Sequence, residues 1–511
     1  MLHAIAVLAV VLDQSPIAAE PPELLRISLA GPATWRVRMQ PTDLGAMLAT
    51  EPAEKLWRRH VDDLDATLRA VHGADAEFAR ERARLLDYAG TLHVVTWLEQ
   101  AEDALHVPRW SAAVVAEPDG HTDLEAMARE SEGWLRRVGE QASNAWRELR
   151  PGTPRVHAGR LVVVFADDDA RVAATARALA WRGKPLDPRD VLRVEGEVGP
   201  LLGLLRDRAW ERGLAADVLG AATRRFVVTC GAFGPDVAAM VRLQFDAGGD
   251  RGVFAGLAPV RTGVPDLQGL VPDETSLRVA WQVDWAAVWN SYCTVLAGVQ
   301  ERSVAATRAR LQRTCGDVVQ SLVPHLRSDV LLVCGPGDPD DGVVPFARAG
   351  LVVALQDQDR VVEALAPVVA AFGARFLPAA DGAQVADFGF VQLFVGDGVL
   401  VLGSAEHGPG LAAQVRSRIA ETGVPPAKFA DAGAGVSGAG TVAVGAFLRG
   451  ELYAALRLLP MLLGSDGLPT GPTGLVDEVE RWTPLLKAHR LDTAALDLRG
   501  RTDEIVVRVL W

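Results

Sequence analysis

The chain has 511 residues, of which 49% are hydrophobic and 23% charged, and its formal net charge is -13 at pH 7. This composition is typical of a folded globular protein and excludes disorder as the main state. The length exceeds the roughly 250–300 residues at which a single hydrophobic core stops growing, so two domain-sized units are expected. The acidic excess argues against binding to nucleic acid, whose phosphates require clustered cations.

An apolar run from Ala4 to Leu12 opens the chain, and small residues follow at Ala18 and Ala19. The run is too short to cross a bilayer, which takes about 20 apolar residues. It fits the hydrophobic part of a secretory signal peptide that is cleaved near those alanines. We therefore predict a signal peptide over residues 1–19 and an extracytoplasmic protein, periplasmic or secreted. A buried first strand or helix is the alternative. No other segment indicates an integral membrane span.

The most informative feature is an internal repeat. Three apolar segments of the first half recur in the second half at offsets of 238, 238 and 239 residues: 92–96 as 330–334, 113–116 as 351–354, and 159–164 as 398–403. The helical stripes that follow these segments keep the same offsets. A nearly constant offset across strands and helices indicates that one structural unit occurs twice.

Both halves contain the same kinds of element in the same order. We expect extended segments at 35–39 and 277–283 to open the two halves, and strand pairs to close them: 226–230 with 240–245, and 494–498 with 505–510. Strands joined by loops rather than by helices imply antiparallel pairing. The prediction is an α+β fold with two homologous tandem lobes, 24–255 and 266–511. Each lobe is expected to be a mainly antiparallel sheet with helices packed on one face.

The chain has four cysteines, which are Cys230, Cys293, Cys315 and Cys334. Their spacing matches no zinc or redox motif. Outside the cytoplasm an even number permits disulfides, and Cys293 with Cys315 is the favoured pair because the two residues are close in the sequence. Four buried thiols that pack as small apolar groups are the alternative.

A group of segments in the second half resembles a known family. These are the strand and capped helix at Val283-Asp284-Trp285, the strand 330–333, and the segment 396–404 (GDGVLVLGS) before a helix. They resemble exported bacterial proteins classed only as a domain of unknown function. The resemblance covers mainly residues 268–511 and more faintly 24–247. It implies an extracytoplasmic antiparallel α+β protein and carries over no catalytic residue.

The sequence contains no well-matched motif for catalysis or cofactor binding. The segment 433–438 matches G-x-G-x-x-G, but it leads into a strand-like segment instead of opening a helix, so a loop is favoured. There is no G-x-S-x-G and no H-E-x-x-H. The acidic segment 338–342 could offer oxygen ligands to calcium, but it lacks the EF-hand pattern and is better explained as a solvated turn. We therefore assign no catalytic, cofactor-binding or metal-binding residue, and no cofactor.

Two functional hypotheses follow. The first is a non-catalytic binding or scaffold protein of the cell envelope, with an unknown ligand or envelope partner. The alternative is an exported hydrolase with an unrecognised active site in the first lobe, built on His93 and an acidic residue. A pocket that holds His93 within hydrogen-bond reach of a carboxylate and a nucleophile would favour the hydrolase.

Overall fold

The structure is a computed structural model. It describes residues 23–59, 62, 88–98, 110–120, 122–141, 150–168, 170–198, 223–246, 251, 254, 256, 266–271, 275–300, 302–335, 348–379, 382–422, 438–443, 473–500 and 504–511. These residues divide into two compact units, with the boundary between Gln244 and Phe245. The predicted signal peptide, 1–19, lies outside the described residues.

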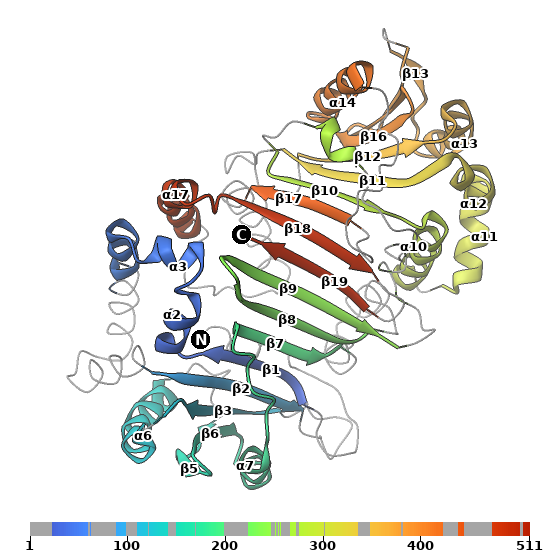
Figure 1. Ribbon diagram of the computed structural model, residues 1–511. Coiled ribbons are helices and arrows are strands. Elements are labelled where there is room, and N and C mark those ends of the chain that lie inside the picture. Colours follow the sequence, from blue (N-terminus) through green and yellow to red (C-terminus); the bar gives the residue numbers. More distant parts are fainter. Residues whose placement is uncertain are drawn as a thin grey trace. The chain divides into compact units, whose positions relative to one another are not determined.

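Unit 1 is built on an antiparallel sheet (Figure 1). Its elements are β1 (Glu23–Ala30), α2 (Pro32–Met39), α3 (Asp43–Leu48), β2 (Gly90–Leu98), β3 (Trp110–Pro118), α6 (Leu124–Gln141), β4 (Arg150–Pro151), β5 (Arg155–His157), β6 (Arg160–Ala166), α7 (Arg171–Ala180), β7 (Asp190–Glu197), β8 (Thr223–Phe233) and β9 (Asp236–Phe245). The strands pair in the order β8-β7-β1-β2-β3-β6, and β4 and β5 both pair with the outer edge of β6.

Unit 2 also has an antiparallel sheet. Its elements are β10 (Leu277–Gln282), α10 (Trp285–Val299), α11 (Val304–Cys315), α12 (Val318–Ser321), β11 (Leu326–Cys334), β12 (Ala349–Leu355), α13 (Gln358–Ala371), β13 (Leu377–Pro378), β14 (Gln384–Asp387), β15 (Val391–Gly396), β16 (Val399–Ser404), α14 (Gly408–Thr422), β17 (Gly438–Ala443), α17 (Thr473–Ala488), β18 (Thr493–Gly500) and β19 (Glu504–Leu510), with short 3-10 turns at Asp266–Leu270 and Val323–His325. The strands pair in the order β19-β18-β17-β10-β11-β12-β16-β15-β14-β13.

The same pairing order therefore occurs in both units. The strands β8-β7-β1-β2-β3-β6-β5 of unit 1 match β18-β17-β10-β11-β12-β16-β15 of unit 2, and α6 and α7 take the chain positions of α13 and α14. The hairpins β5–β6 and β15–β16 also share their turn. Ala158 and Gly159 in one, and Asp397 and Gly398 in the other, all have positive φ, as a type I′ hairpin turn requires.

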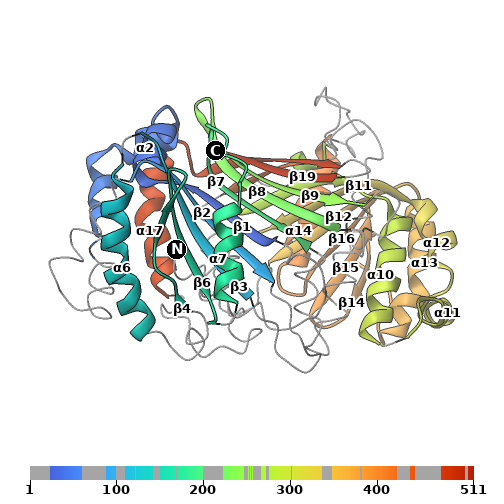
Figure 2. The ribbon, with the colours of Figure 1, turned by 90° about the horizontal axis from the view of Figure 1, so that it is seen from below.

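Helices cover both faces of each sheet, so the expectation that they pack on one face is wrong. In unit 1, α7 packs on Val162 and Val164, whereas α6 packs on Leu161, which points to the other face of β6. Figure 2 shows these two helices on opposite sides of β6. In unit 2, α14 packs on Val401 and α13 on Leu400 in the same way. A strand covered on both faces reads as a continuous apolar run, as β6 does, and not as an alternation.

The strand predicted at 35–39 is also wrong, because these residues belong to helix α2. The alternation Trp35-Arg36-Val37-Arg38 has the period of a strand, but Pro32 occupies the first turn, where its fixed φ favours a helix. The opening strand of unit 1 is instead β1. The expected extended segment at 277–283 and both closing strand pairs are confirmed by β10, β8 with β9, and β18 with β19.

One detail of the repeat is corrected by the strand register. Val94 pairs with Val114, whereas Leu332, which follows Val94 by 238 residues, pairs with Leu351 and not with Val352. The offset between β3 and β12 is therefore 237. Both strands are apolar on both faces, so a slip of one residue leaves an equally good apolar match and cannot be detected from the sequence.

All four cysteines are free thiols, so Cys293 and Cys315 form no disulfide in this structure. Cys293 and Cys334 are buried, and Cys230 and Cys315 are partly buried. The alternative of four packed thiols is therefore closer to the outcome. Burial raises the pKa of Cys230, Cys293 and Cys315.

Within the described residues, no helix combines the length and the hydrophobicity needed to span a membrane.

Candidate functional site

Two features of unit 1 bear on function: a buried polar cluster around His93, and an open cavity beside α7. The cluster begins with Ser28 on β1 and His93 on β2, which are direct cross-strand partners. The Ser28 hydroxyl lies 2.8 Å from His93 Nδ1, which is hydrogen-bond distance. Both residues are only 1% exposed. Sequence analysis placed His93 in an apolar strand and did not identify Ser28 as its partner.

Glu117 and Arg160 complete this part of the cluster. Glu117, at the end of β3, has Oε2 at 3.5 Å from His93 Nε2 and Oε1 at 3.7 Å from an Arg160 guanidinium nitrogen. Arg160 also donates to the backbone oxygen of Trp181. The Trp181 ring packs edge-on against the His93 imidazole, with 5.3 Å between the ring centres. Burial lowers the pKa of His93, an effect that Arg26 and Arg160 reinforce and Glu117 opposes. A lowered pKa keeps the imidazole neutral near pH 7.

Serine, histidine and a carboxylate in this order are the groups that a hydrolase uses to activate a nucleophile. Ser28 meets the hydrogen-bond part of the hydrolase criterion, since it lies at hydrogen-bond distance from His93. Glu117 does not, because it lies 3.5 Å from His93 Nε2, which is buried without a hydrogen-bond partner. The pocket part is not met either, since a substrate must reach the serine oxygen and Ser28 is buried. None of the three residues lines the cavity beside α7. As placed, the cluster fills the interior of a sheet face.

A second group of charges adjoins the first on the neighbouring strands. Glu195 on β7 is buried and accepts from Arg26 at 2.9 Å, from Arg193 at 2.9 Å, and from Arg225. Burial raises the pKa of Glu195, but the hydrogen bond and charge of Arg193, with the charges of Arg26 and Arg225, outweigh it and lower that pKa. The Arg26 guanidinium also lies 5.2 Å from the centre of the Trp181 ring.

Sequence analysis missed this group because it missed β7. The segment 190–197 (DVLRVEGE) alternates between apolar and charged residues, which is a strand signal. The charged positions place Arg193 and Glu195 on one face, next to Arg26 on β1. At the corresponding place in unit 2, Arg278 on β10 faces Thr441 on β17 and donates to its hydroxyl at 2.7 Å.

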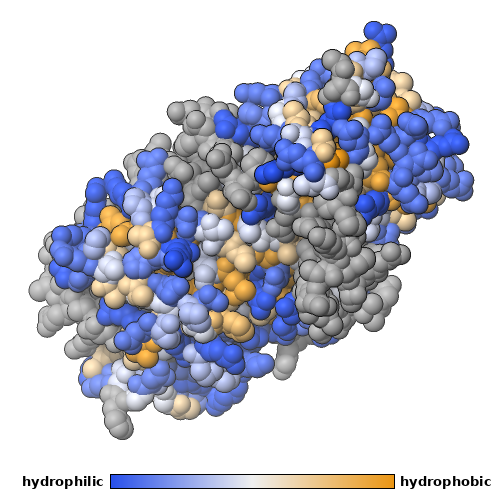
Figure 3. All heavy atoms as spheres, turned by 45° about the horizontal axis from the view of Figure 1, so that its top comes forward, coloured by the Kyte–Doolittle hydropathy of each residue, from blue (hydrophilic) through white to orange (hydrophobic). Residues whose placement is uncertain are grey.

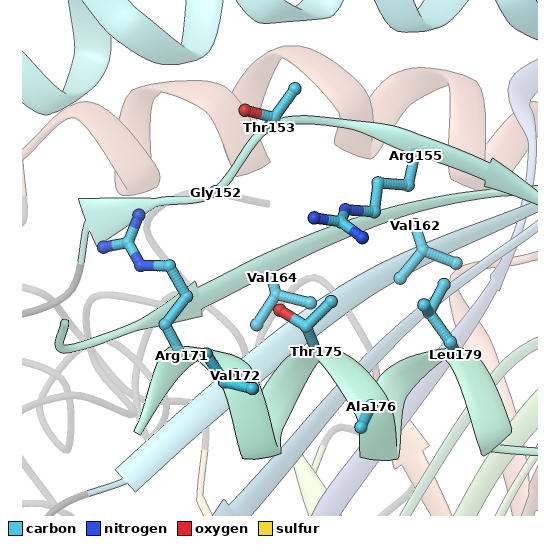
Figure 4. Close-up of a pocket in the computed structure, with 10 residues that line it drawn as sticks. All are labelled: Gly152, Thr153, Arg155, Val162, Val164, Arg171, Val172, Thr175, Ala176 and Leu179. Atoms are coloured by element: carbon cyan, nitrogen blue, oxygen red, sulfur yellow. The ribbon is translucent and has the colours of Figure 1, made fainter. Parts of the chain in front are cut away.

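The cavity lies between α7 and the β4–β5 edge of the sheet and has a volume of about 390 Å³ (Figure 4). This is within the range of small-molecule sites, roughly 300–1,000 Å³. Val162 and Val164 of β6 form its apolar floor, and Thr175 and Leu179 of α7 form one wall. Val172, which is 81% exposed, lies at its edge.

Two arginines flank this cavity. Figure 4 shows Arg155 extending over it from β5 and Arg171 rising from the first turn of α7. Arg171 donates to the backbone oxygen of Ala166 and pairs with Asp168 at 2.9 Å, while its Nε is buried without a hydrogen-bond partner. Arg155 has no hydrogen bond or ion pair within the described part of the chain. The cavity thus combines an apolar floor with an exposed cation that has no ion-pair partner among the described residues.

Other residues considered in the sequence are not brought into either feature. His407 lies before α14 in unit 2. The glycine-rich segment 433–437, the acidic segment 338–342 and His121 lie outside the described residues. Over the described ranges, no three His, Cys, Asp or Glu residues lie close enough together to hold a metal ion. The coloured surface in Figure 3 is mostly hydrophilic, with apolar residues in separate groups.

Comparison with known proteins gave no family model, no curated protein and no solved structure that matches this chain.

Proposed function

We propose that the protein is a non-catalytic binding protein of the cell envelope, exported by its N-terminal segment, and that the cavity beside α7 is its binding site. The observation that carries this proposal is the contrast between the two features of unit 1. The groups that could catalyse hydrolysis, Ser28 and His93, are buried. The cavity is open, has the volume of a ligand site, and holds an arginine without a partner among the described residues.

The proposal also includes the duplication of one ancestral lobe. The binding site is proposed for one of the two copies, unit 1. The shared pairing order and the shared hairpin turn support this duplication. A copy that keeps its fold is free to change its helix-to-sheet packing, since function lies in sites added to a fold and not in the fold itself.

A retention experiment tests the binding function. The purified full chain is incubated with a small-molecule extract of bacterial envelopes, and retained compounds are identified by mass spectrometry. We expect the wild type and Ser28→Ala to retain the same compound, and Ala176→Leu, which adds volume inside the cavity, to lose it. If Ala176→Leu retains whatever the wild type retains, or if neither retains anything, the proposal is wrong.

Export is tested separately. Expression of the full chain in a bacterium, followed by fractionation and N-terminal sequencing, should give an extracytoplasmic protein that begins after Ala19. An uncleaved protein that stays in the cytoplasm would contradict the proposed location and leave the binding function standing.

The second candidate function is a hydrolase that uses Ser28 as nucleophile. The 2.8 Å distance between Ser28 and His93, with Glu117 near the other ring nitrogen, is the observation that favours it. Hydrolysis of a p-nitrophenyl ester by the wild type and not by Ser28→Ala would support it. Equal rates for the two proteins would dismiss it.

A further inference from the structure

The ligand class of the cavity follows from a comparison of the two hairpins that border α7 and α14. Arg155 pairs with Val162 in β5–β6, and Phe394 pairs with Val401 in β15–β16. Each residue stands three positions before the positive-φ residue of its turn. Arg155 and Phe394 therefore occupy the same place relative to the sheet and to the helix that covers it.

Unit 2 fills this place with apolar side chains. Phe394 and Leu411 pack against the core that contains Val401 and Val415. At the offset of 239 residues, the corresponding residues of unit 1 are Arg155, Val172, Val162 and Ala176. Three side chains that fill unit 2 are thus replaced by one arginine and two smaller residues, so that apolar volume is removed where the cavity opens.

In unit 2 the helix also approaches the sheet closely. A Cβ atom at Gly403 would meet the Cα atom of Gly408 at 2.8 Å, so β16 and the start of α14 are held at a distance that only glycine permits. Val164 is the residue of unit 1 that corresponds to Gly403. Val164 has the side chain that Gly403 lacks, and it forms part of the cavity floor.

The charges select the ligand. Arg155 lacks a partner among the described residues, whereas Arg171 pairs with the exposed Asp168. The α7 N-cap, Ala170, offers no side-chain hydrogen bond to the first turn, where a helix attracts negative charge. Asp167 accepts from the Ala170 backbone amide at 2.7 Å. The Thr175 hydroxyl is turned towards the cavity (Figure 4).

We propose that the cavity binds a monoanionic amphiphile, with a carboxylate head on Arg155 and an alkyl part over Val162, Val164 and Leu179. This inference rests on the proposed binding function. A guanidinium binds a carboxylate through two parallel hydrogen bonds. The apolar floor binds the alkyl part through burial of its surface.

Calorimetric titration of the full chain tests this ligand class with decanoate as the probe, and with decanol and decyltrimethylammonium as matched neutral and cationic probes. We expect wild type to bind decanoate and to bind the other two at least about tenfold more weakly. Arg155→Gln should weaken decanoate binding by roughly 10- to 100-fold, the effect of losing a charge-assisted hydrogen bond. Arg418→Gln, an exposed arginine on α14, is the control and should leave binding unchanged.

Val172→Glu is a second variant that does not disturb packing, because Val172 is 81% exposed. It places a like charge at the edge of the cavity and should weaken decanoate binding as well. Equal binding of decanoate and decanol, or no effect of Arg155→Gln, would overturn the ligand class. If the ligand class is overturned but Ala176→Leu still prevents retention of the envelope compound, the proposed binding function is supported and only the proposed ligand class is wrong. If Ala176→Leu has no effect either, both proposals fail.

Discussion

Ser28 and His93 face each other across β1 and β2 at the place where Ala280 and Leu331 face each other across β10 and β11. All four residues are at most 1% exposed. One position of the sheet therefore holds a hydrogen-bonded polar pair in unit 1 and an apolar pair in unit 2. A polar pair and an apolar pair are thus alternative ways to fill the same position. In each case, both residues of the pair must be of the same kind.

Exchange of the polar pair for the apolar one should show strong coupling. His93→Leu alone leaves the Ser28 hydroxyl buried without its partner and should lower the free energy of unfolding by about 1–3 kcal/mol. The double variant Ser28→Ala with His93→Leu reproduces the pair of unit 2 and should recover most of that loss. Denaturant unfolding of the four proteins of the double-mutant cycle measures the coupling. Additive effects of the two substitutions would contradict a paired role.

The His93 pair should also contribute to the pH dependence of stability. Burial holds the pKa of His93 below its ordinary value of 6.5 in the folded chain, with Arg26 and Arg160 acting in the same direction and Glu117 against them. Below pH 6.5 the unfolded chain then binds more protons than the folded chain, so stability falls as the pH decreases through this value. The wild type should lose more unfolding free energy between pH 7.5 and 5.5 than the double variant. Equal losses would show that His93 does not titrate in this way.

Glu195 should be the most sensitive carboxylate of unit 1. Glu195→Gln removes the charge that Arg26, Arg193 and Arg225 share and should cost about 1.5–3 kcal/mol, the range for hydrogen bonds to charged groups. Since the folded pKa of Glu195 is lowered, its contribution is present above the ordinary value of 4.5 and is lost as the pH falls further.

The matched control for Glu195 is Glu363→Gln, at an exposed ion pair with Arg360 on α13. It should change the unfolding free energy by less than about 1 kcal/mol, because exposed ion pairs contribute little. Denaturant unfolding at pH 7 compares the two variants, and equal effects would contradict the importance of the buried cluster.

Two glycines of the β16–α14 region should respond in opposite directions to alanine. Gly403→Ala places a Cβ atom at 2.8 Å from the Gly408 Cα and should destabilise by roughly 1–3 kcal/mol through overpacking. Gly410→Ala meets nothing within 4 Å and lies inside α14, so it should stabilise by about 0.5–1 kcal/mol. Thermal unfolding measures both changes. If Gly403→Ala did not change stability, the close approach of α14 to β16 would not help to explain why a cavity opens beside α7.

Much of the sheet was predictable from particular segments. The apolar runs around Val94, Val163 and Leu400 mark strands because their β-branched and large side chains suit a pleated, buried surface. The two closing strand pairs were visible for the same reason. The helix α2 was not, because the alternation from Trp35 to Arg38 has the period of a strand, and Pro32 decides the local structure.

The candidate site was much less predictable. His93 stood out as a polar residue in an apolar strand, yet its partner Ser28 is 65 residues away, and only the pairing of β1 with β2 brings them together. The cavity residues belong to no recognisable motif, so nothing in the sequence marks Arg155 or the α7 residues that line the cavity. Their significance appears when Phe394 is found at the place of Arg155, which requires the register of both hairpins.

The amino-acid sequence by itself determined the α+β class, the recurrence of segments at offsets near 238 residues, and the position of many strands. These depend on periodicity and on local offsets, which every residue carries with it. Tertiary structure alone decided that helices cover both sheet faces, that Ser28 meets His93, and that a cavity opens beside α7. Those properties depend on which distant segments become neighbours, and on the volume left between them, which no single segment encodes.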